Sequence, residues 1–452
     1  MEYAFHGREL PHAVAKESYR PVGLWWSLRA KTGAWRVLGC VTPLISGSWL
    51  GWRACPLPDA GRGSRVNAVV RRIPRRLRRV KEQFIEGNRV RLLHDGKEAF
   101  PSMLEAIDQA RRQVMLEMYW FDSDPVGQRF AEALVRARER GVEVAVLYDS
   151  VGSWDVDAAF FAELERARIK VIEYNPIKPW RRRFRVDRLT RRDHRKILVV
   201  DGRVGFTGGI NLARPWLPEE EGGGGWRDDM VKVRGPAVRG LASCFLQTWS
   251  SQGGEPLAVE CGGRESDPPG EQRVRVLGAT SLLNRREIRA AYLVNIYRAK
   301  RRIWMSNSYF VPDRSVIRGL KRAARHGVDV RVLVPGTSDV EMVRHASRGA
   351  WTGLMKSGVR IFEWNRKVLH SKSAVIDGHW STVGTFNLDY WSLLRNLEVN
   401  VAVLDSGFGA RLEAAFERDF ALAKEVDQEE FRQRPLRDRL LELAFYRVRK
   451  LL

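Results

Sequence analysis

Cysteine is scarce in this chain, and so are long apolar runs. Only four of the 452 residues are cysteine, at Cys40, Cys55, Cys244 and Cys261, and their spacing matches no metal-binding motif. A chain of this length does not depend on disulfides for its core, so we expect free thiols in a reducing compartment. The Trp- and Leu-rich stretch 23–52 is interrupted by charged residues and proline. It therefore lacks the roughly 20 consecutive apolar residues of a spanning helix and makes a poor secretory signal.

Acidic residues are outnumbered by basic ones. The chain has 54 Asp and Glu against 78 Lys and Arg, which gives a net charge of +24 and a pI near 10.4. This excess predicts an anionic partner, either nucleic acid or an acidic lipid surface, and composition alone does not choose between them. No group of acidic residues has metal-ligand spacing, so we expect neither a metal ion nor another cofactor.

The main feature that is present is a motif that occurs twice. The first copy, H-R-K-I-L-V-V-D-G-R-V-G-F-T-G-G-I-N, spans residues 194–211, and the second, H-S-K-S-A-V-I-D-G-H-W-S-T-V-G-T-F-N, spans residues 370–387. In each copy a His is followed by Lys two residues later, by Asp seven later and by Asn seventeen later. Chance does not produce two copies with identical internal spacing. We interpret them as a tandem duplication that carries phosphodiester chemistry.

The residue types of the motif suit the binding of one phosphate group. His194 and Lys196, like His370 and Lys372, are two residues apart beside an apolar run, so on a strand they share one face and can grip a small anion. After an Asp-Gly hairpin turn, a second strand brings back an Asn whose amide can donate to a phosphate oxygen. Small residues before that Asn let a ligand approach the backbone closely. These Asn residues and their small neighbours are Asn211, Asn387, Gly208, Gly209, Gly384 and Thr385.

The motif aspartates, Asp201 and Asp377, have two possible roles. An Asp in an Asp-Gly turn is usually a turn former, and we favour that structural role over direct catalysis. The carboxylate that orients each His then has to come from elsewhere in the chain. The best candidates are Asp228 in W-R-D-D, which follows the first motif, and Glu398 in N-L-E, which follows the second.

The order of the predicted elements is duplicated as well. From about residue 88, apolar strand-like runs alternate with helix-like stretches, as in an α/β fold. The run G-V-E-V-A-V-L-Y at 141–148 has its counterpart in G-V-D-V-R-V-L-V at 327–334. We expect a first domain at 88–255 and a second at 270–427, joined by a Gly- and Pro-bearing stretch. A pseudo-twofold axis between them would bring both motifs into one site.

Three basic segments lie outside this repeat. The leader, residues 1–87, combines a Trp-rich stretch with the arginine run at 71–79, which suits attachment to anionic headgroups as well as a solvated linker. The tail, residues 428–452, has the pattern of a basic amphipathic helix, which either packs on its own domain or lies in the membrane plane. An insertion before His194 contains Arg181, Arg182 and Arg183, and we favour a role in gathering anionic substrate over a merely solvated loop.

The two H-x-K-x4-D-x6-G-[GT]-x-N motifs resemble those of the phospholipase D superfamily. Within it, W-R-D-D-M-V-K-V-R-G-P-A-V at 226–238 and the segment 370–400 are most similar to bacterial cardiolipin synthases. The resemblance covers roughly residues 88–425. It implies an α/β fold in which two phospholipase D-like α/β/α lobes, related by tandem duplication, form one composite active site at their interface.

The resemblance also implies a phosphohistidine mechanism without a metal ion. One His, usually that of the first half and thus His194, attacks phosphorus, while His370 protonates the leaving alkoxide and then activates the incoming hydroxyl. Lys and Asn of both motifs stabilise the charge on the phosphate oxygens, and Asp228 and Glu398 fix the imidazole tautomers. The implied reaction transfers a phosphatidyl group from one phosphatidylglycerol to another and releases glycerol. The implied setting is the cell membrane, with the chain bound to anionic phospholipid as a peripheral protein on the cytoplasmic face.

Three other functions fit the same motifs. A phospholipase D would use water as acceptor and release phosphatidic acid, a nuclease or phosphodiesterase would bind nucleic acid through the positive charge, and a binding protein would have lost catalysis. The Trp-rich leader, the amphipathic tail and the chain length speak against a nuclease, so we expect no obligatory nucleic acid. Every motif position is filled, which speaks against a binding protein. The sequence leaves open the acceptor and the oligomeric state.

Overall fold

The computed structural model describes residues 82–181, 183–257, 270–278, 286–338 and 340–450. These residues belong to one compact unit, which spans residues 65–452. The expected leader at 1–87 lies almost entirely outside the described residues, as does Arg182. The domain boundaries expected at 255 and 270 remain predictions.

The described strands form one mixed sheet of 15 strands. The strands of the first half are β1 (Ile85–His94), β2 (Gln113–Met118), β3 (Glu143–Asp149), β4 (Lys170–Tyr174), β5 (Ile197–Val200), β6 (Val204–Gly208) and β7 (Asp229–Arg234). Those of the second half are β8 (Gln272–Gly278), β9 (Arg302–Asn307), β10 (Asp329–Pro335), β11 (Arg360–Trp364), β12 (Lys372–Ile376), β13 (Trp380–Gly384), β14 (Val399–Leu404) and the short β15 (Lys424–Glu425).

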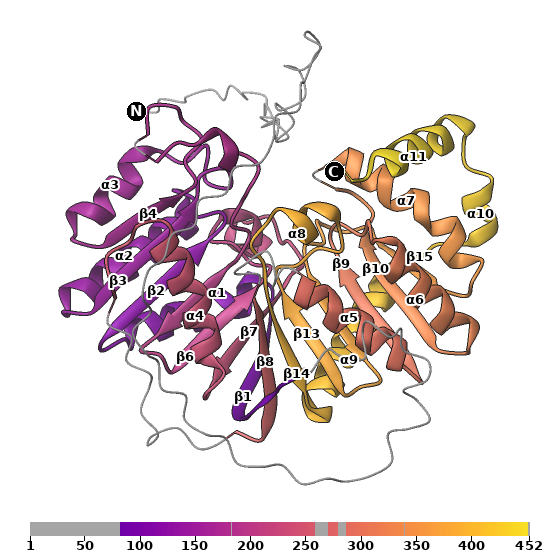
Figure 1. Cartoon of the computed structure of the whole chain (residues 1–452), viewed down its shortest axis with the longest axis horizontal. Coiled ribbons are helices and arrows are strands. Elements are labelled where there is room, and N and C mark those ends of the chain that lie inside the picture. Colours follow the sequence, from indigo (N-terminus) through magenta and orange to yellow (C-terminus); the bar gives the residue numbers. More distant parts are fainter. Residues whose placement is uncertain (1–81, 182, 258–269, 279–285, 339, 451–452) are drawn as a thin grey trace, which may run out of the picture. The chain divides into compact units, whose positions relative to one another are not determined.

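The strand order is the same in both halves when it is read outward from the centre of the sheet. From β1 the first half continues through β7, β6, β5, β2, β3 and β4, and from β8 the second half continues through β14, β13, β12, β9, β10 and β11. The two halves join where β1 and β8 pair in antiparallel orientation (Figure 1). This repeated order confirms the predicted tandem duplication of an α/β unit.

Helices connect the strands in both halves. The first half contains α1 (Asp95–Asp108), α2 (Pro125–Glu139), α3 (Ala158–Arg166) and α4 (Val238–Ser251). The second half contains α5 (Glu287–Arg298), α6 (Arg314–Arg325), α7 (Glu341–Met355), α8 (Tyr390–Leu394), α9 (Ser406–Leu422), α10 (Gln428–Arg432) and α11 (Leu436–Val448). Short 3-10 turns cover Val186–Arg188, Arg214–Trp216 and Glu219–Glu221. The side chains of Asp124 and Asp313 accept backbone N–H groups and so fix the starts of α2 and α6.

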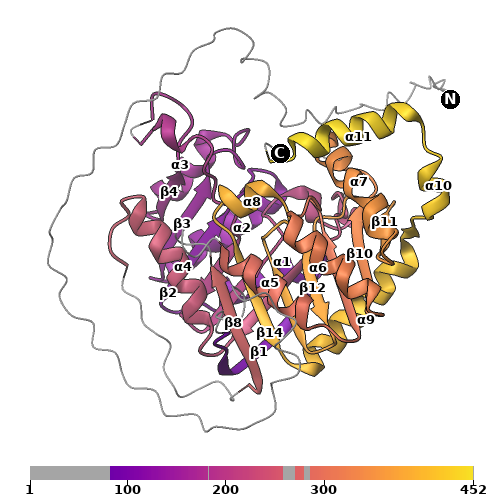
Figure 2. The same ribbon diagram turned by 45° about the vertical axis from the view of Figure 1, so that its right-hand side comes forward.

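The helices cover both faces of the sheet. On one face, Phe245 of α4 and Phe416 of α9 belong to a single apolar cluster that runs through both halves. On the other face, α1–α3 cover the first half and α5–α7 cover the second (Figures 1 and 2). Because both faces are covered, whole strands are apolar, and every residue of β5 and β13 is buried. This is the expected α/β/α layering.

Among the residues that the structure describes, no helix combines the length and the apolar character that crossing a bilayer requires.

Candidate active site

Each motif His lies where the parallel strands of its half end. His194 stands just before β5, which runs antiparallel to β2, and His370 stands just before β12, which runs antiparallel to β9. The carboxyl ends of β2–β4 and of β9–β11 therefore surround the histidines of their halves. Loops at such strand ends are the usual place for a binding site in α/β proteins. We call these strand ends and their loops the site face, which is the upper side in Figure 1.

Backbone contacts between the halves bring the two histidines together. The N–H of His194 donates to the carbonyl of Leu397 at 3.0 Å, and the N–H of His370 donates to the carbonyl of Arg227 at 2.8 Å. Both contacts are part of short parallel bridges between the halves. Each His is thus attached to the residue that precedes a carboxylate of the other half.

The two His–carboxylate pairs are crossed between the halves. Nδ1 of His194 lies 3.1 Å from Oε2 of Glu398, and Nδ1 of His370 lies 2.7 Å from Oδ2 of Asp228. A neutral imidazole whose Nδ1–H donates to a carboxylate has its basic lone pair on Nε2, the atom that can attack or accept a proton. The sequence indicated both carboxylates but not which His each one meets.

Both imidazoles are held in the neutral form. Burial, followed by the charge of Lys196, lowers the pKa of His194. Burial, followed by the charge of Lys372, lowers the pKa of His370 to about 4. Burial alone would raise the pKa of Asp228, but His370 and its hydrogen bond leave that pKa below its usual value, so the carboxylate is ionised.

Further donors fix the two carboxylates in place. The indole N–H of Trp216 donates to Oδ2 of Asp228 at 2.9 Å, and the hydroxyl of Thr385 donates to Oε2 of Glu398 at 2.5 Å. Gly209 lies so close to Asp228 that a Cβ there would clash with its carboxylate. We expected Gly209 and Thr385 to contact a ligand, but the structure places them against the carboxylates that orient the histidines.

The small residues one position earlier serve strand packing. A Cβ on Gly208 would clash with the backbone of Asp229, and a Cβ on Gly384 would clash with the side chain of Asn400. Their lack of a side chain therefore lets β6 and β13 approach β7 and β14 closely. The ligand contact that the sequence suggested for Gly208 and Gly384 has no support in this packing.

The motif lysines place two buried ammonium groups beside the histidines. The ammonium groups of Lys196 and Lys372 each donate to the carbonyl of the His two residues earlier, that of Lys196 at 2.8 Å. Burial, followed by the charge of Lys372, lowers the pKa of Lys196 to about 7. Lys196 also lies 4.9 Å from the centre of the Tyr119 ring. Two buried cations in one place are a binding site for an anion.

The motif asparagines are oriented so that they can donate. Oδ1 of Asn211 accepts the backbone N–H of Trp120 at 3.1 Å, and Oδ1 of Asn387 accepts the hydroxyl of Ser308 at 2.8 Å. These contacts fix the flip of each amide, so its NH₂ group is the end that a phosphate oxygen can use.

The motif aspartates form the hairpin turns at the other end of their strands. Asp201 and Asp377 adopt positive φ angles of 53° and 54°, as the first residue of this turn type requires. The carboxylate of Asp201 accepts N–H groups of residues 111–113, and that of Asp377 those of residues 300–302. Seven residues of extended chain separate each Asp from its His, or roughly 20 Å. The structure therefore does not bring the carboxylates of Asp201 and Asp377 to the histidines.

The arginine insertion follows β4 and so belongs to the site face. Arg181 and Arg183 are exposed and have partners nearby: Arg181 lies 3.4 Å from a carboxylate oxygen of Glu173, and Arg183 donates to the carbonyl of Gln252 at 2.7 Å. Their contacts with Glu173 and Gln252 do not reach the histidines, and their role in gathering anionic substrate remains a prediction. The described part of the insertion thus supplies charge near the site and not within it.

Aromatic side chains around the histidines were missed by the sequence reasoning. The ring of Tyr119 packs edge-on against His194 at 5.0 Å, and that of Trp216 packs edge-on against His370 at 5.2 Å. Trp226 approaches His370 at 5.8 Å. Trp226 stands in the W-R-D-D segment, which was the one signal that could have pointed to it. These rings exclude water and stabilise the neutral imidazoles.

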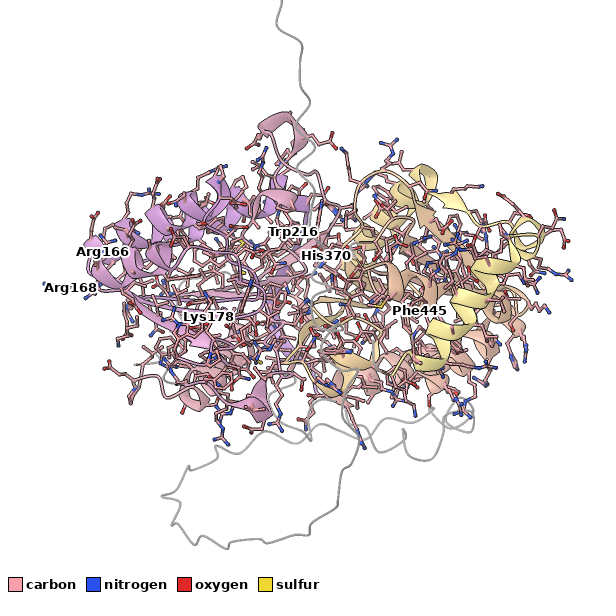
Figure 3. All side chains as sticks on the ribbon, turned by 90° about the horizontal axis from the view of Figure 1, so that it is seen from above. Arg166, Arg168, Lys178, Trp216, His370 and Phe445 are labelled. Atoms are coloured by element: carbon pink, nitrogen blue, oxygen red, sulfur yellow. The ribbon has the colours of Figure 1, made fainter. Side chains whose placement is uncertain are left out.

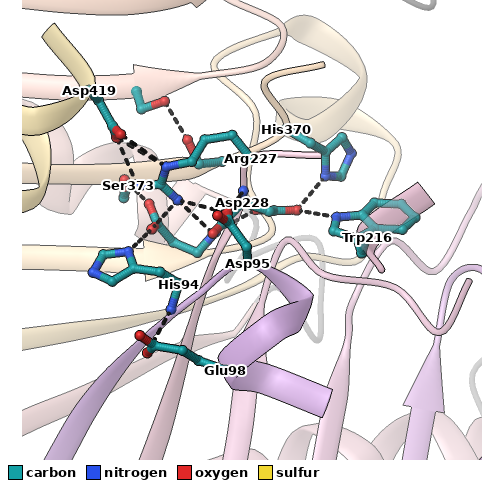
Figure 4. A network of polar contacts seen from close by, with 12 residues as sticks. His94, Asp95, Glu98, Trp216, Arg227, Asp228, His370, Ser373 and Asp419 are labelled. Atoms are coloured by element: carbon teal, nitrogen blue, oxygen red, sulfur yellow. Dashed lines mark hydrogen bonds and ion pairs between the residues drawn. The ribbon is translucent and has the colours of Figure 1, made fainter. Parts of the chain in front are cut away.

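Arg227 ties the backbone of Asp228 to both halves (Figure 4). Its guanidinium donates to Asp229 at 2.7 Å, to the carbonyl of Asp228 at 2.6 Å, and across to Asp419 of α9 at 2.8 Å. The backbone N–H of Asp228 in turn donates to Asp95 at 2.8 Å. Removal of one member of such a buried charge network is strongly destabilising, so the network holds Asp228 rigidly.

Comparisons with known proteins point to one family. The family model described as "Cardiolipin synthase, PLD-like domain" matches residues 103–220 and 292–420. The cardiolipin synthase of Geobacillus thermodenitrificans (strain NG80-2) is 36% identical over 356 residues, which cover 78% of this chain and 70% of that protein. Cardiolipin synthase 1 of Bacillus anthracis is 31% identical over 367 residues, which cover 79% and 71%.

A solved structure shows the same fold. The phosphatidylserine synthase of Haemophilus influenzae Rd KW20 superposes with a TM-score of 0.59 at 14% identity, over 82% of this chain and 97% of that one. The family match includes both His-Lys pairs and Glu398, although its first segment ends before Asp228. As the motifs indicated, the chain belongs to the cardiolipin synthase family of phospholipase D-like enzymes.

Proposed function

We propose that this chain joins two phosphatidylglycerol molecules into cardiolipin and releases glycerol. The observation that carries the proposal is the pair of crossed His–carboxylate contacts beside two buried lysines. This arrangement provides a nucleophile, a proton carrier and a site for one phosphodiester anion in a single place. The relatives named cardiolipin synthase support cardiolipin as the product.

In the first step, Nε2 of His194 attacks phosphorus and the bond from phosphorus to the glycerol oxygen breaks. His370 gives its proton to that oxygen, so glycerol leaves as a neutral alcohol. Glu398 stabilises the positive charge that the substituted imidazole of His194 acquires. The product is a phosphatidyl group held on His194.

The proton on His370 depends on the substrate. In the free site the pKa of His370 is about 4, so the imidazole is neutral near physiological pH. A bound phosphodiester brings negative charge beside Lys372 and His370, which raises the pKa of His370 because an opposite charge favours the protonated form. His370 therefore carries the proton that it must donate when the substrate anion is bound.

In the second step, neutral His370 accepts the proton of a free hydroxyl of the second phosphatidylglycerol. The resulting oxygen nucleophile attacks phosphorus, the bond from phosphorus to Nε2 of His194 breaks, and cardiolipin forms. His194 is again neutral and His370 is again protonated, so the cycle consumes no proton. Lys196, Lys372, Asn211 and Asn387 hold the phosphate oxygens where charge develops in both steps.

We place this reaction at the surface of an anionic phospholipid membrane, with the chain bound peripherally on the cytoplasmic face. The net charge of +24 supports such binding, because acidic lipids attract basic proteins. Membrane binding also matters for the acceptor, since a lipid hydroxyl must outcompete water at the phosphatidyl-His194 intermediate.

The proposal is tested by mass spectrometry of the lipids after incubation with phosphatidylglycerol vesicles. We expect cardiolipin and glycerol in equal amounts. Phosphatidic acid without cardiolipin would mean that water is the acceptor and would replace the proposal with a phospholipase D activity. Unchanged lipids, together with nicking of DNA, would indicate a nuclease. A His194→Ala, His370→Ala variant is the control for contaminating activity.

A further inference from the structure

We propose that the site face is a docking surface for an anionic lipid bilayer and that α11 is its main anchor. The inference deepens the proposed function, because it names the surface through which the enzyme meets its lipid. It rests on exposed apolar side chains, on the charges beside them and on their place around the active site.

The outer surface of α11 combines apolar and basic residues. Leu436, Leu440 and Leu443 are exposed by 66%, 57% and 44%, and their spacing of four and three residues places them in one stripe of the helix. Arg439 and Arg447 are exposed along the same stripe. Apolar side chains flanked by arginine are the pattern of a helix that lies in the interface of an anionic membrane.

The inner surface of α11 carries its buried acidic residue and fixes the helix to the protein. Glu442 is 1% exposed and accepts from Arg348 of α7 at 3.1 Å, and also from Arg434. Phe445 stacks on His345 of α7 with 5.8 Å between ring centres. This packing turns Glu442 away from solvent, so its carboxylate does not offset the positive charge of Arg439 and Arg447 on the outer surface.

A second apolar patch lies across the active site from α11. Trp154 follows β3, and Trp180 and Val186 follow β4, with exposures of 50%, 78% and 72%. The ammonium of Lys178 lies 5.3 Å from the centre of the Trp154 ring. Exposed tryptophan next to basic side chains is typical of residues that sit at the level of lipid headgroups.

A third contact point lies close to the second motif. Leu394 ends α8, which begins three residues after Asn387, and it is 50% exposed. Figures 1 and 2 both show α8 on the same side of the molecule as α7 and α11. Figure 3 looks onto this side and labels Lys178, His370 and Phe445 in one view. Leu394 therefore marks the part of the face that is nearest the catalytic residues.

The exposed apolar side chains are concentrated on the site face and are not scattered over the surface. This distribution favours a site that binds a lipid surface. Of ten large apolar side chains that are exposed among the described residues, seven belong to these three groups, an eighth is Val448 at the end of α11, and only Ile85 and Leu422 lie elsewhere. Three separated contact points around one site suit a broad, flat partner such as a bilayer. They would hold the histidines towards the lipid from which both substrates come.

The test compares binding to vesicles of phosphatidylglycerol and of phosphatidylcholine by co-sedimentation. The full chain with Leu436→Ser, Leu440→Ser and Leu443→Ser should bind phosphatidylglycerol vesicles at least about tenfold more weakly, because less apolar surface is buried. Leu443→Ser alone should weaken binding, whereas Ile85→Ser should not. Leu443 and Ile85 are both 44% exposed, but Ile85 lies at the end of β1 remote from the site face.

Turnover of phosphatidylglycerol in detergent mixed micelles separates docking from catalysis and from misfolding. The triple variant should retain this turnover, because no substituted residue touches the site. If the triple variant binds phosphatidylglycerol vesicles as tightly as the unaltered chain does, the proposed docking surface is wrong. A change from dimer to monomer in the triple variant with no loss of vesicle binding would also overturn it, because the stripe would then be an interface between copies. If the unaltered chain makes no cardiolipin in micelles but its vesicle binding still depends on the stripe, the proposed function fails and the docking surface stands.

Discussion

Binding of an anion at the active site should be coupled to the uptake of a proton by Lys196. Burial and the charge of Lys372 lower the pKa of Lys196 to about 7 in the free site. A phosphodiester between the two ammonium groups reverses the second effect, so the pKa of Lys196 rises in the complex. This rise in the pKa of Lys196 fixes the direction of the pH dependence of anion binding. Above about pH 7 the free enzyme has lost this proton and must regain it to bind, so the affinity for the anion falls as the pH rises.

The size of the effect follows from the same pKa. If the anion binds only the protonated form of Lys196, its apparent Kd should increase about tenfold for each pH unit above 7, which corresponds to about 1.4 kcal/mol per unit. Near pH 8 about nine-tenths of the free enzyme lacks the proton on Lys196, so Lys196 should take up about 0.9 proton per bound anion, to which the proton taken up by His370 is added. The pKa values of both histidines are lowered, which keeps their titration in the free site below this window.

Isothermal titration calorimetry with sulfate measures this proton uptake. Sulfate does not titrate in this range and presents oxygens as a phosphodiester does. The heat should differ between two buffers of unequal ionisation enthalpy, and the difference gives the number of protons. Lys196→Arg is the matched control, because a guanidinium stays protonated: its heat should depend less on the buffer, and only the proton that His370 takes up should remain. A buffer-independent heat for the unaltered enzyme, or a Kd that is constant from about pH 7 to 9, would refute the reasoning.

Three further outcomes are expected. With a labelled substrate that has a good leaving group, His194→Ala should abolish the covalent phosphoenzyme while His370→Ala still forms it, and label on His370 in the absence of His194 would reverse the two roles. Excess chelator should leave turnover unchanged, because Lys and Asn side chains supply the positive charge at phosphate, and a loss that a divalent ion restores would contradict this. Replacing Arg181, Arg183 and Arg185 by Gln should weaken binding to anionic vesicles, as added salt does, and shift products from cardiolipin towards phosphatidic acid. Unchanged binding and an unchanged product ratio would remove the insertion from the mechanism.

Local patterns predicted what depends on neighbouring residues. The Asp-Gly pairs predicted both hairpins because positive φ angles are needed there and these residues adopt them. The alternation of strand-like and helix-like stretches predicted the α/β layers, because this pattern also depends on neighbouring residues. The fold of each half is therefore largely visible in the sequence.

Contacts between segments that are remote in the chain could not be predicted from the sequence. Asp228 follows the first motif in the sequence, yet it orients the His of the second, and no local pattern records that exchange. Gly209 could be recognised as a position that allows close approach, but the group that approaches is the carboxylate of Asp228 and not a ligand. Trp216 lies in a 3-10 turn without any motif, and only the assembled halves place its indole on Asp228.

The crossed pairs also constrain the ancestry of the enzyme. A single half carries a His without its carboxylate and a carboxylate without its His, so an ancestor with one copy of the repeat could orient an imidazole only as a homodimer. In a single chain the two copies can change separately. The buried ion pair of Glu117 with Arg195, at 2.6 Å, has as its counterpart in the other half a hydrogen bond between the hydroxyls of Ser306 and Ser371. A symmetric dimer could not hold this difference, and a fused chain can use it to give two identical histidines unequal tasks.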